Sequence, residues 1–101
     1  MYRGTTPKFS LKLETDISFD DIEECYVTIA SKIVNLTIGK DRLDFNDEMK
    51  RIELTLTQEE TLQFHEGNAE IQVRIKLKDG TALASTIDKT VINKILKNGV
   101  I

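Results

Sequence analysis

The sequence has little of several residue types on which disulfide-bonded, secreted and membrane proteins depend. It contains one cysteine, one proline and no tryptophan in 101 residues. A single cysteine, Cys25, forms no internal disulfide, which fits a reducing compartment. No apolar run approaches the roughly 20 residues of a membrane-spanning helix, and the first residues lack the apolar core of a signal peptide. We therefore expect the chain to be cytoplasmic when it is synthesised.

Neither sign of charge is in large excess. The chain carries 14 basic and 17 acidic residues, for a net charge of −3. Nucleic-acid-binding proteins usually present a basic stripe, and membrane-surface contacts need a polybasic cluster. The five glycines stand alone, and none belongs to a phosphate-binding loop. The composition thus predicts neither a nucleic-acid partner nor a membrane partner.

Side chains that carry out chemistry are few and scattered. His65 is the only histidine, and a catalytic role would need a nucleophile or a metal ligand beside it. Nothing in the sequence brings Cys25 close to it, so a surface histidine and a buried thiol are the simpler interpretations. We predict a protein that is not an enzyme, with no catalytic residue, cofactor or metal ion.

Two acidic groups offer alternatives to this prediction. They are Asp20, Asp21, Glu23 and Glu24, and Asp41, Asp44, Asp47 and Glu48. The first lacks the alternating ligands, glycine and distal glutamate of a calcium loop, so it indicates a solvated face. The second leaves a paired-carboxylate hydrolase open, although scattered loop acids on a small sandwich are usually inert.

Aromatic side chains are also scarce, with two tyrosines and four phenylalanines. Carbohydrate-binding sandwiches commonly present exposed aromatic platforms, so this scarcity weakens a sugar-binding interpretation. Tyr2 and Tyr26 keep it open, but partial burial in the core is favoured for both.

What the sequence does contain is apolar alternation with a period of two, the pattern of half-buried strands. It recurs at residues 8–13, 25–30, 34–38, 43–45, 52–57, 69–77 and 82–87. Asp79 and Gly80 predict a tight hairpin between the last two segments. About seven short strands with turn signals between them predict a mainly β fold, an antiparallel sandwich forming one domain over residues 1–101.

Three short helical segments interrupt this pattern. Ser18 followed by acidic residues predicts a helical turn near residues 19–24. Thr57 and Glu60 match a capping box, which predicts a second turn near residues 58–64. Val91, Ile92, Ile95 and Leu96 at helical spacing are typical of a short C-terminal helix, and equally Thr90 and Val91 could extend the last strand.

The two ends of the chain are candidate contact elements. The arm, residues 1–7, is polar and either disordered or ordered on a neighbour. The tail, residues 89–101, either folds back or docks onto another subunit. The candidate partner contacts are Tyr2, Arg3, Pro7, Ile92, Ile95, Leu96, Val100 and Ile101. Small side chains over residues 82–85 would also let a partner strand approach closely.

The change of period at Thr57 has a known counterpart. Residues 56–61 resemble the Leu-x-x-Glu-Asp-Thr motif at the corner between two late strands of immunoglobulin-type domains. The matching positions are Leu56, Glu59, Glu60 and Thr61. This resemblance implies a crossing between two sheets and an immunoglobulin-like sandwich.

Over nearly its whole length the chain resembles small proteins encoded by prophages of Gram-positive bacteria. The residues that carry the resemblance are 2–7, 56–61, Asp79 with Gly80, Ile95 with Leu96, and 99–101. The pattern is similar to the immunoglobulin-like N-terminal module of upper baseplate proteins in phages of lactic-acid bacteria, a module that attaches a receptor-binding assembly to the tail. We expect this chain, unlike that module's parent proteins, to have no long helix and no C-terminal receptor-binding domain.

The resemblance implies a non-enzymatic structural or adaptor protein of a phage or prophage tail or baseplate. Its partners would be other tail subunits or further copies of itself, and it would join the virion after assembly. The alternative is a free binding module for a host protein or a cell-wall carbohydrate.

Overall fold

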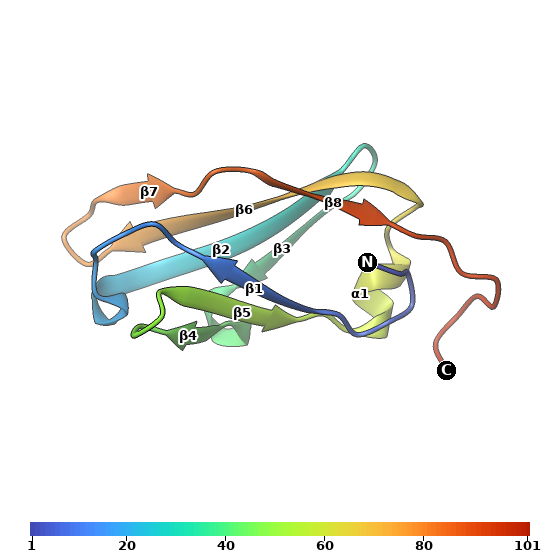
Figure 1. Cartoon of the computed structure of the whole chain (residues 1–101), viewed down its shortest axis with the longest axis horizontal. Helices are drawn as coiled ribbons and strands as arrows, with labels where there is room; N and C mark the ends of the chain where they lie inside the picture. The colour runs from blue at the N-terminus through green and yellow to red at the C-terminus, as the bar shows by residue number, and fades with distance from the viewer.

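The structure, a computed structural model, describes residues 1–101 and consists of two facing antiparallel sheets (Figure 1). The strands are β1 (Lys8–Lys12), β2 (Ile22–Ser31), β3 (Asn35–Gly39), β4 (Asp44–Asn46), β5 (Arg51–Thr55), β6 (Gly67–Leu77), β7 (Ala82–Ala84) and β8 (Asp88–Ile92). The helical segments are η1 (Phe19–Asp21), η2 (Lys40–Arg42) and α1 (Gln58–Leu62). The predicted mainly β sandwich is confirmed.

The strand order places β1, β5 and β4 in the smaller sheet and β3, β2 and β6 in the larger one. Both β7 and β8 pair with the outer edge of β6, β7 near its end and β8 near its start. With β7 and β8 counted as one interrupted edge strand, this is the order of strands B-E-D and C′-C-F-G in immunoglobulin domains. The sequence predicted about seven strands. The structure has eight, because the edge strand beside β6 is divided into β7 and β8.

Ser85 explains the interruption between β7 and β8. Its backbone N–H still donates to the Val73 carbonyl at 2.9 Å. Its hydroxyl, however, accepts the Val73 N–H at 3.0 Å and donates to the Thr86 carbonyl at 2.9 Å. Because the hydroxyl takes the bond that the carbonyl of Ser85 itself would accept in a regular ladder, the chain leaves the ladder. It rejoins β6 at Asp88, opposite Ile71.

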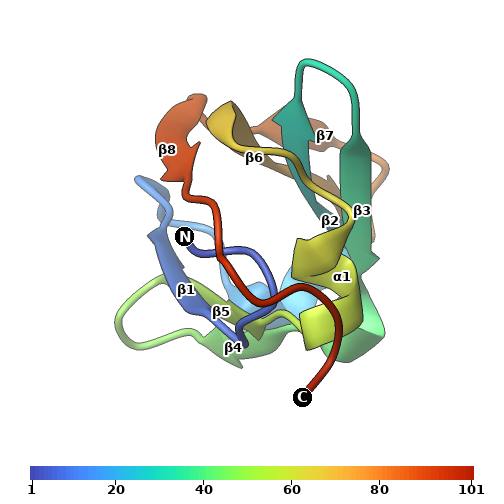
Figure 2. The same cartoon turned by 90° about the vertical axis from the view of Figure 1, so that its right-hand side faces the viewer.

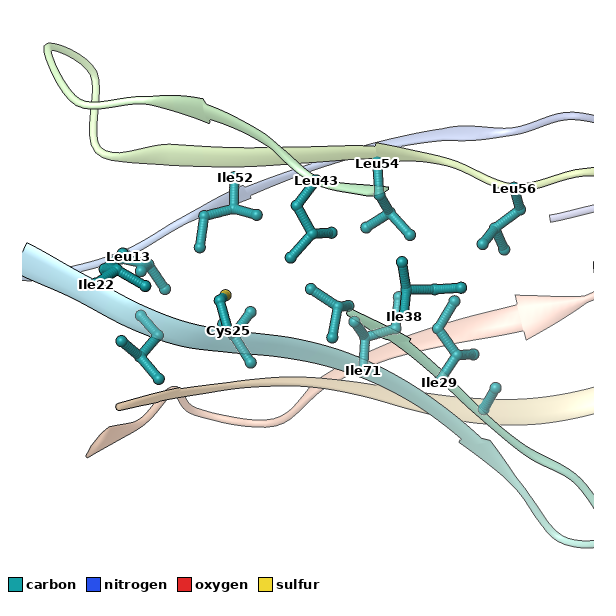
Figure 3. Close-up of a cluster of buried hydrophobic side chains, with 14 of the residues drawn as sticks. Leu13, Ile22, Cys25, Ile29, Ile38, Leu43, Ile52, Leu54, Leu56 and Ile71 are labelled. Atoms are coloured by element: carbon teal, nitrogen blue, oxygen red, sulfur yellow. The ribbon is translucent and has the colours of Figure 1, made fainter. Parts of the chain in front are cut away.

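The core lies between the sheets and follows the predicted alternation (Figure 3). Every second side chain of β6 is buried, from Ala69 to Leu77. The longest pairing, between β2 and β6, sets Val27 opposite Val73 on the same inward face. Full burial of such a side chain contributes about 1.5–3 kcal/mol, so this strand pair forms the centre of the fold.

Helix α1 carries the chain from β5 in one sheet to β6 in the other. The predicted capping box is confirmed: the Glu60 N–H donates to the Thr57 hydroxyl at 3.1 Å, and the Thr57 N–H donates to the Glu60 carboxylate at 2.8 Å. Arg42 on η2 adds two bonds to the same carboxylate, at 2.8 and 2.7 Å. The change of period at Thr57 therefore marks a crossing between sheets.

Two helical expectations need correction. The first turn is confined to η1, because β2 begins at Ile22 and pairs with Leu77, so residues 22–24 are strand. The expected C-terminal helix is absent: β8 extends to Ile92 and the residues after it are irregular. A helix of so few residues is marginal in water, and strand pairing satisfies the backbone better.

The charge on Glu60 should make part of the stability pH-dependent. The Arg42 bonds and the Thr57 cap lower the pKa of Glu60 from 4.5 to about 2. A lowered pKa stabilises the folded state at pH values above 4.5, and this contribution disappears as the pH falls from 4.5 towards 2. We expect Glu60→Gln to cost about 1–2 kcal/mol at pH 7 and much less near pH 3, measured by urea unfolding.

The control is Glu59→Gln, since Glu59 is exposed on the same helical turn. It should change the free energy of unfolding by less than about 0.5 kcal/mol at either pH. A Glu60→Gln deficit that is equal at pH 7 and pH 3 would contradict the role given to the carboxylate.

Candidate functional site

The arm is ordered against its own domain, beside the end of β8 (Figure 2). The Asn93 N–H donates to the Met1 carbonyl at 2.7 Å, and the Arg3 N–H donates to the Asn93 carbonyl at 3.1 Å. Tyr2 thus forms a parallel bridge with Asn93. The arm extends the larger sheet beyond β8 and then leads through Pro7 into β1 of the smaller sheet.

Arg3 attaches the arm to the carboxyl end of α1. Its guanidinium donates to the Leu62 carbonyl at 3.0 Å and also to the Phe64 carbonyl. These carbonyls lack partners within the helix, and a cation is favoured at this end of the helix dipole. The buried Thr61 hydroxyl adds a bond to the Thr5 carbonyl at 2.9 Å. The arm is therefore part of the fold in the isolated chain.

Residues 89–92 of the tail belong to β8, so the free part of the tail is residues 93–101. The Gln58 side chain holds its last residue: the Ile101 N–H donates to the Gln58 amide oxygen at 2.9 Å, and the Gln58 amide group donates to the Ile101 carbonyl at 3.2 Å. The apolar side chains of this end face solvent, since Leu96 is 94% exposed and Ile101 is 89% exposed. The tail folds back without burying them.

The candidate contact residues divide into two groups. Ile92 is 1% exposed and belongs to the core, and the Arg3 guanidinium is engaged with α1. Pro7 and Ile95 are half-buried. The exposed members are Tyr2, Leu96, Val100 and Ile101. Figure 1 shows both termini at the same end of the molecule, beside α1, so the arm and the tail form one surface.

Sequence reasoning missed two members of this surface. Gln58 holds the tail, but a glutamine in the first turn of a helix gives no sign of a distant partner. Val91 is exposed and lines a shallow depression together with Tyr2 and Lys94. Its exposure follows from strand alternation next to the buried Ile92, a signal that helical spacing concealed.

The chemistry-bearing residues lie apart. Cys25 is fully buried on β2, and burial raises the pKa of its thiol to about 11. His65 is exposed in the connection between α1 and β6. The two acidic groups contain exposed side chains, and no three acidic, histidine or cysteine side chains are arranged to hold a metal ion.

The expectation of partly buried tyrosines is wrong. Tyr2 is 57% exposed and Tyr26 is 43% exposed. Tyr26 lies on the outward-facing positions of β2, opposite Arg74 and Gly39, and Tyr2 lies on the exposed side of the arm.

Comparison with known proteins gives no relative: no protein-family model, curated protein or solved structure matches the chain. None of its helices has the length and apolar character that crossing a membrane requires.

Gly4 packs closely against Ile95 of the tail. It has a φ of +70°, and a Cβ placed on it would lie 2.9 Å from the Ile95 Cδ1 atom. We expect Gly4→Ala to destabilise the protein by about 1–3 kcal/mol, because alanine is strained in this conformation. Hydrogen exchange at the Arg3 and Asn93 amides should become faster.

Gly99→Ala is the matched control, since Gly99 also has positive φ, at +85°, but nothing lies within 4 Å of its Cβ position. It should leave exchange at Arg3 and Asn93 unchanged. Equal acceleration in both variants would contradict the close packing of arm and tail.

Truncation to alanine should lower the free energy of unfolding strongly at Ile92 and very little at Leu96. Ile92→Ala removes a buried side chain and should cost about 2–5 kcal/mol. Leu96→Ala removes an exposed one and should change stability by no more than about 0.5 kcal/mol. Thermal and urea unfolding of the two variants would check this, and a large loss in Leu96→Ala would show that the tail packs more closely than described.

Proposed function

We propose that this protein is a non-enzymatic structural or adaptor component of a phage or prophage tail or baseplate. Its contact surface is the end of the sandwich formed by the arm, α1 and the tail. The family resemblance of the sequence suggests the setting, and the surface suggests how the protein attaches.

The exposed apolar tail is the observation that carries the proposal. Leu96, Val100 and Ile101 leave large apolar side chains in water although the backbone of Ile101 is held by Gln58. Exposed apolar side chains that gather on one part of a surface mark interaction sites. Tyr2 adds an exposed aromatic side chain at the same end, and aromatic residues are enriched at protein interfaces.

The test is mass spectrometry of particles released from the source strain after prophage induction. The protein should occur at a fixed ratio to the known tail proteins. A double variant, Leu96→Asp with Ile101→Asp, should keep the fold, because both side chains are exposed, and should lose most of its incorporation, about tenfold or more for the loss of two apolar anchors.

Ile33→Asp is the matched control, since Ile33 is also a strongly exposed isoleucine but lies outside this surface, 73% exposed between β2 and β3. It should be incorporated like the wild type. If particles lack the wild-type protein and it stays in the lysate, the tail proposal fails and the free binding module for a host protein or cell-wall carbohydrate takes its place.

A further inference from the structure

The end of the molecule away from the termini has an open groove between the two sheets. It lies between the edge of β1 and the edge of β7, with a volume of about 290 Å³. Leu13, Ile17, Ile75 and Leu83 form its apolar lining. Leu83 lies opposite the buried Ile75 and on the same inward face, yet it is 39% exposed. The sandwich therefore lacks a side chain across from Leu83.

Both strands beside the groove have an unpaired edge. The Ser85 N–H donates to Val73 of β6, so by antiparallel alternation the backbone groups of Ala82 and Ala84 point away from β6. The Lys12 backbone points away from β5 for the same reason. β7 itself carries no charged residue and no proline, the usual devices that protect an edge strand.

The arm covers only one half of this side of the sandwich. Residues 1–3 pair with the chain at Val91 and Asn93 and close the gap between β8 and β1, as Figure 2 shows. No segment does the same between β7 and β1. On this side of the sandwich, the arm therefore fills the gap between β8 and β1, whereas the groove between β7 and β1 is left open.

The charges around the groove indicate what could fill it. Residues 12–17 form one wall, in which Glu14 and Lys12 line the groove and Asp16 lies in the same segment. The acidic residues at positions 20–24 follow in η1 and at the start of β2, outside the lining. An apolar segment with positive charge would complement this rim.

The tail of this same chain has those properties. Its free part, residues 93–101, contains two lysines, Lys94 and Lys97, and no acidic residue. Its exposed Leu96 and Ile101 side chains are branched aliphatic groups, of a size that a groove of about 290 Å³ accepts. That volume is below the usual range of about 300–1,000 Å³ for small-molecule sites.

The donor of the tail must be a second copy. The molecule is 46 Å long, and Figure 1 shows the tail at the opposite end from β7. The two Gln58 bonds hold Ile101 at its own end of the molecule. A tail that enters the groove of a neighbour leaves that neighbour's tail free for the next copy, which is a head-to-tail contact.

We propose that this protein associates head to tail, with the apolar, basic tail of one copy in the acidic-rimmed groove between β1 and β7 of the next. The tail residues that enter are Leu96 and Ile101, and Lys94 and Lys97 face the acidic wall. The biological use of this contact rests on the proposed function, but the contact itself is a property of the purified protein.

The decisive experiment mixes two variants that each keep one half of the contact. The tail variant is Leu96→Asp with Ile101→Asp, and the groove variant is Leu83→Arg, with Ala84→Arg as its substitute if it does not fold. Circular dichroism establishes folding, and sedimentation velocity gives the mass. Each variant alone should be a monomer, and an equimolar mixture should form one dimer that grows no further.

The wild type should grow beyond a dimer as its concentration rises, because every added copy brings a free tail. Three results would overturn the proposal: a wild type that stays monomeric at millimolar concentration, a wild type that stops at two chains, or a mixture of variants that stays monomeric. A monomeric protein that is nevertheless incorporated into particles would refute the head-to-tail contact and leave the proposed function standing.

A charge exchange tests the complementarity separately. Lys94→Glu with Lys97→Glu should weaken association about tenfold or more, and adding Glu14→Lys with Asp16→Lys to the same chain should restore most of it. Association that is unaffected by the first pair of substitutions would refute the role of charge. Raising the salt concentration from 0.05 to 0.5 M should weaken the wild-type contact severalfold, since screening shortens the Debye length to a few ångströms.

Discussion

The fold depends on how five residues of helix α1 are held at both ends. The smaller sheet ends in β5 and the larger one resumes in β6, so this helix is the joint between them. Glu60 closes its amino end through Thr57 and Arg42, and Arg3 closes its carboxyl end. A helix this short has no stability of its own. Its caps therefore set the relative position of the sheets, and the arm becomes a structural element through one of them.

The same arrangement separates the molecule into two unlike ends. At one end the arm, the joint and the tail share hydrogen bonds, and apolar side chains remain on the surface. At the other end the sheets are open between β1 and β7, beside a loop rich in acidic residues. The difference arises because the arm reaches only to residues 91–93, and the strand that would continue past it is interrupted at Ser85.

Local patterns in the sequence predicted most of the elements. Alternation located the strands and their buried faces, and the Thr57–Glu60 spacing located the joint, because these signals act between near neighbours. The contacts of the arm were not predictable, since Arg3 and Leu62 are far apart in the chain and backbone carbonyls leave no trace in a sequence. The interruption between β7 and β8 was not predicted because it depends on the hydrogen bonds of one Ser85 hydroxyl. The irregular conformation of the tail was not predicted because the spacing of its apolar residues fits a helix equally well.

The bonds between Met1, Arg3 and Asn93 also constrain how the protein forms during synthesis. The arm leaves the ribosome about ninety residues before these partners do, at the usual 5–20 residues per second. Until then, β8 is not paired with the outer edge of β6, and the core around Ala69 is exposed to water. The sandwich can collapse on its β2–β6 centre early, but the edge closes only after β8 has emerged, and this closure joins segments about ninety residues apart.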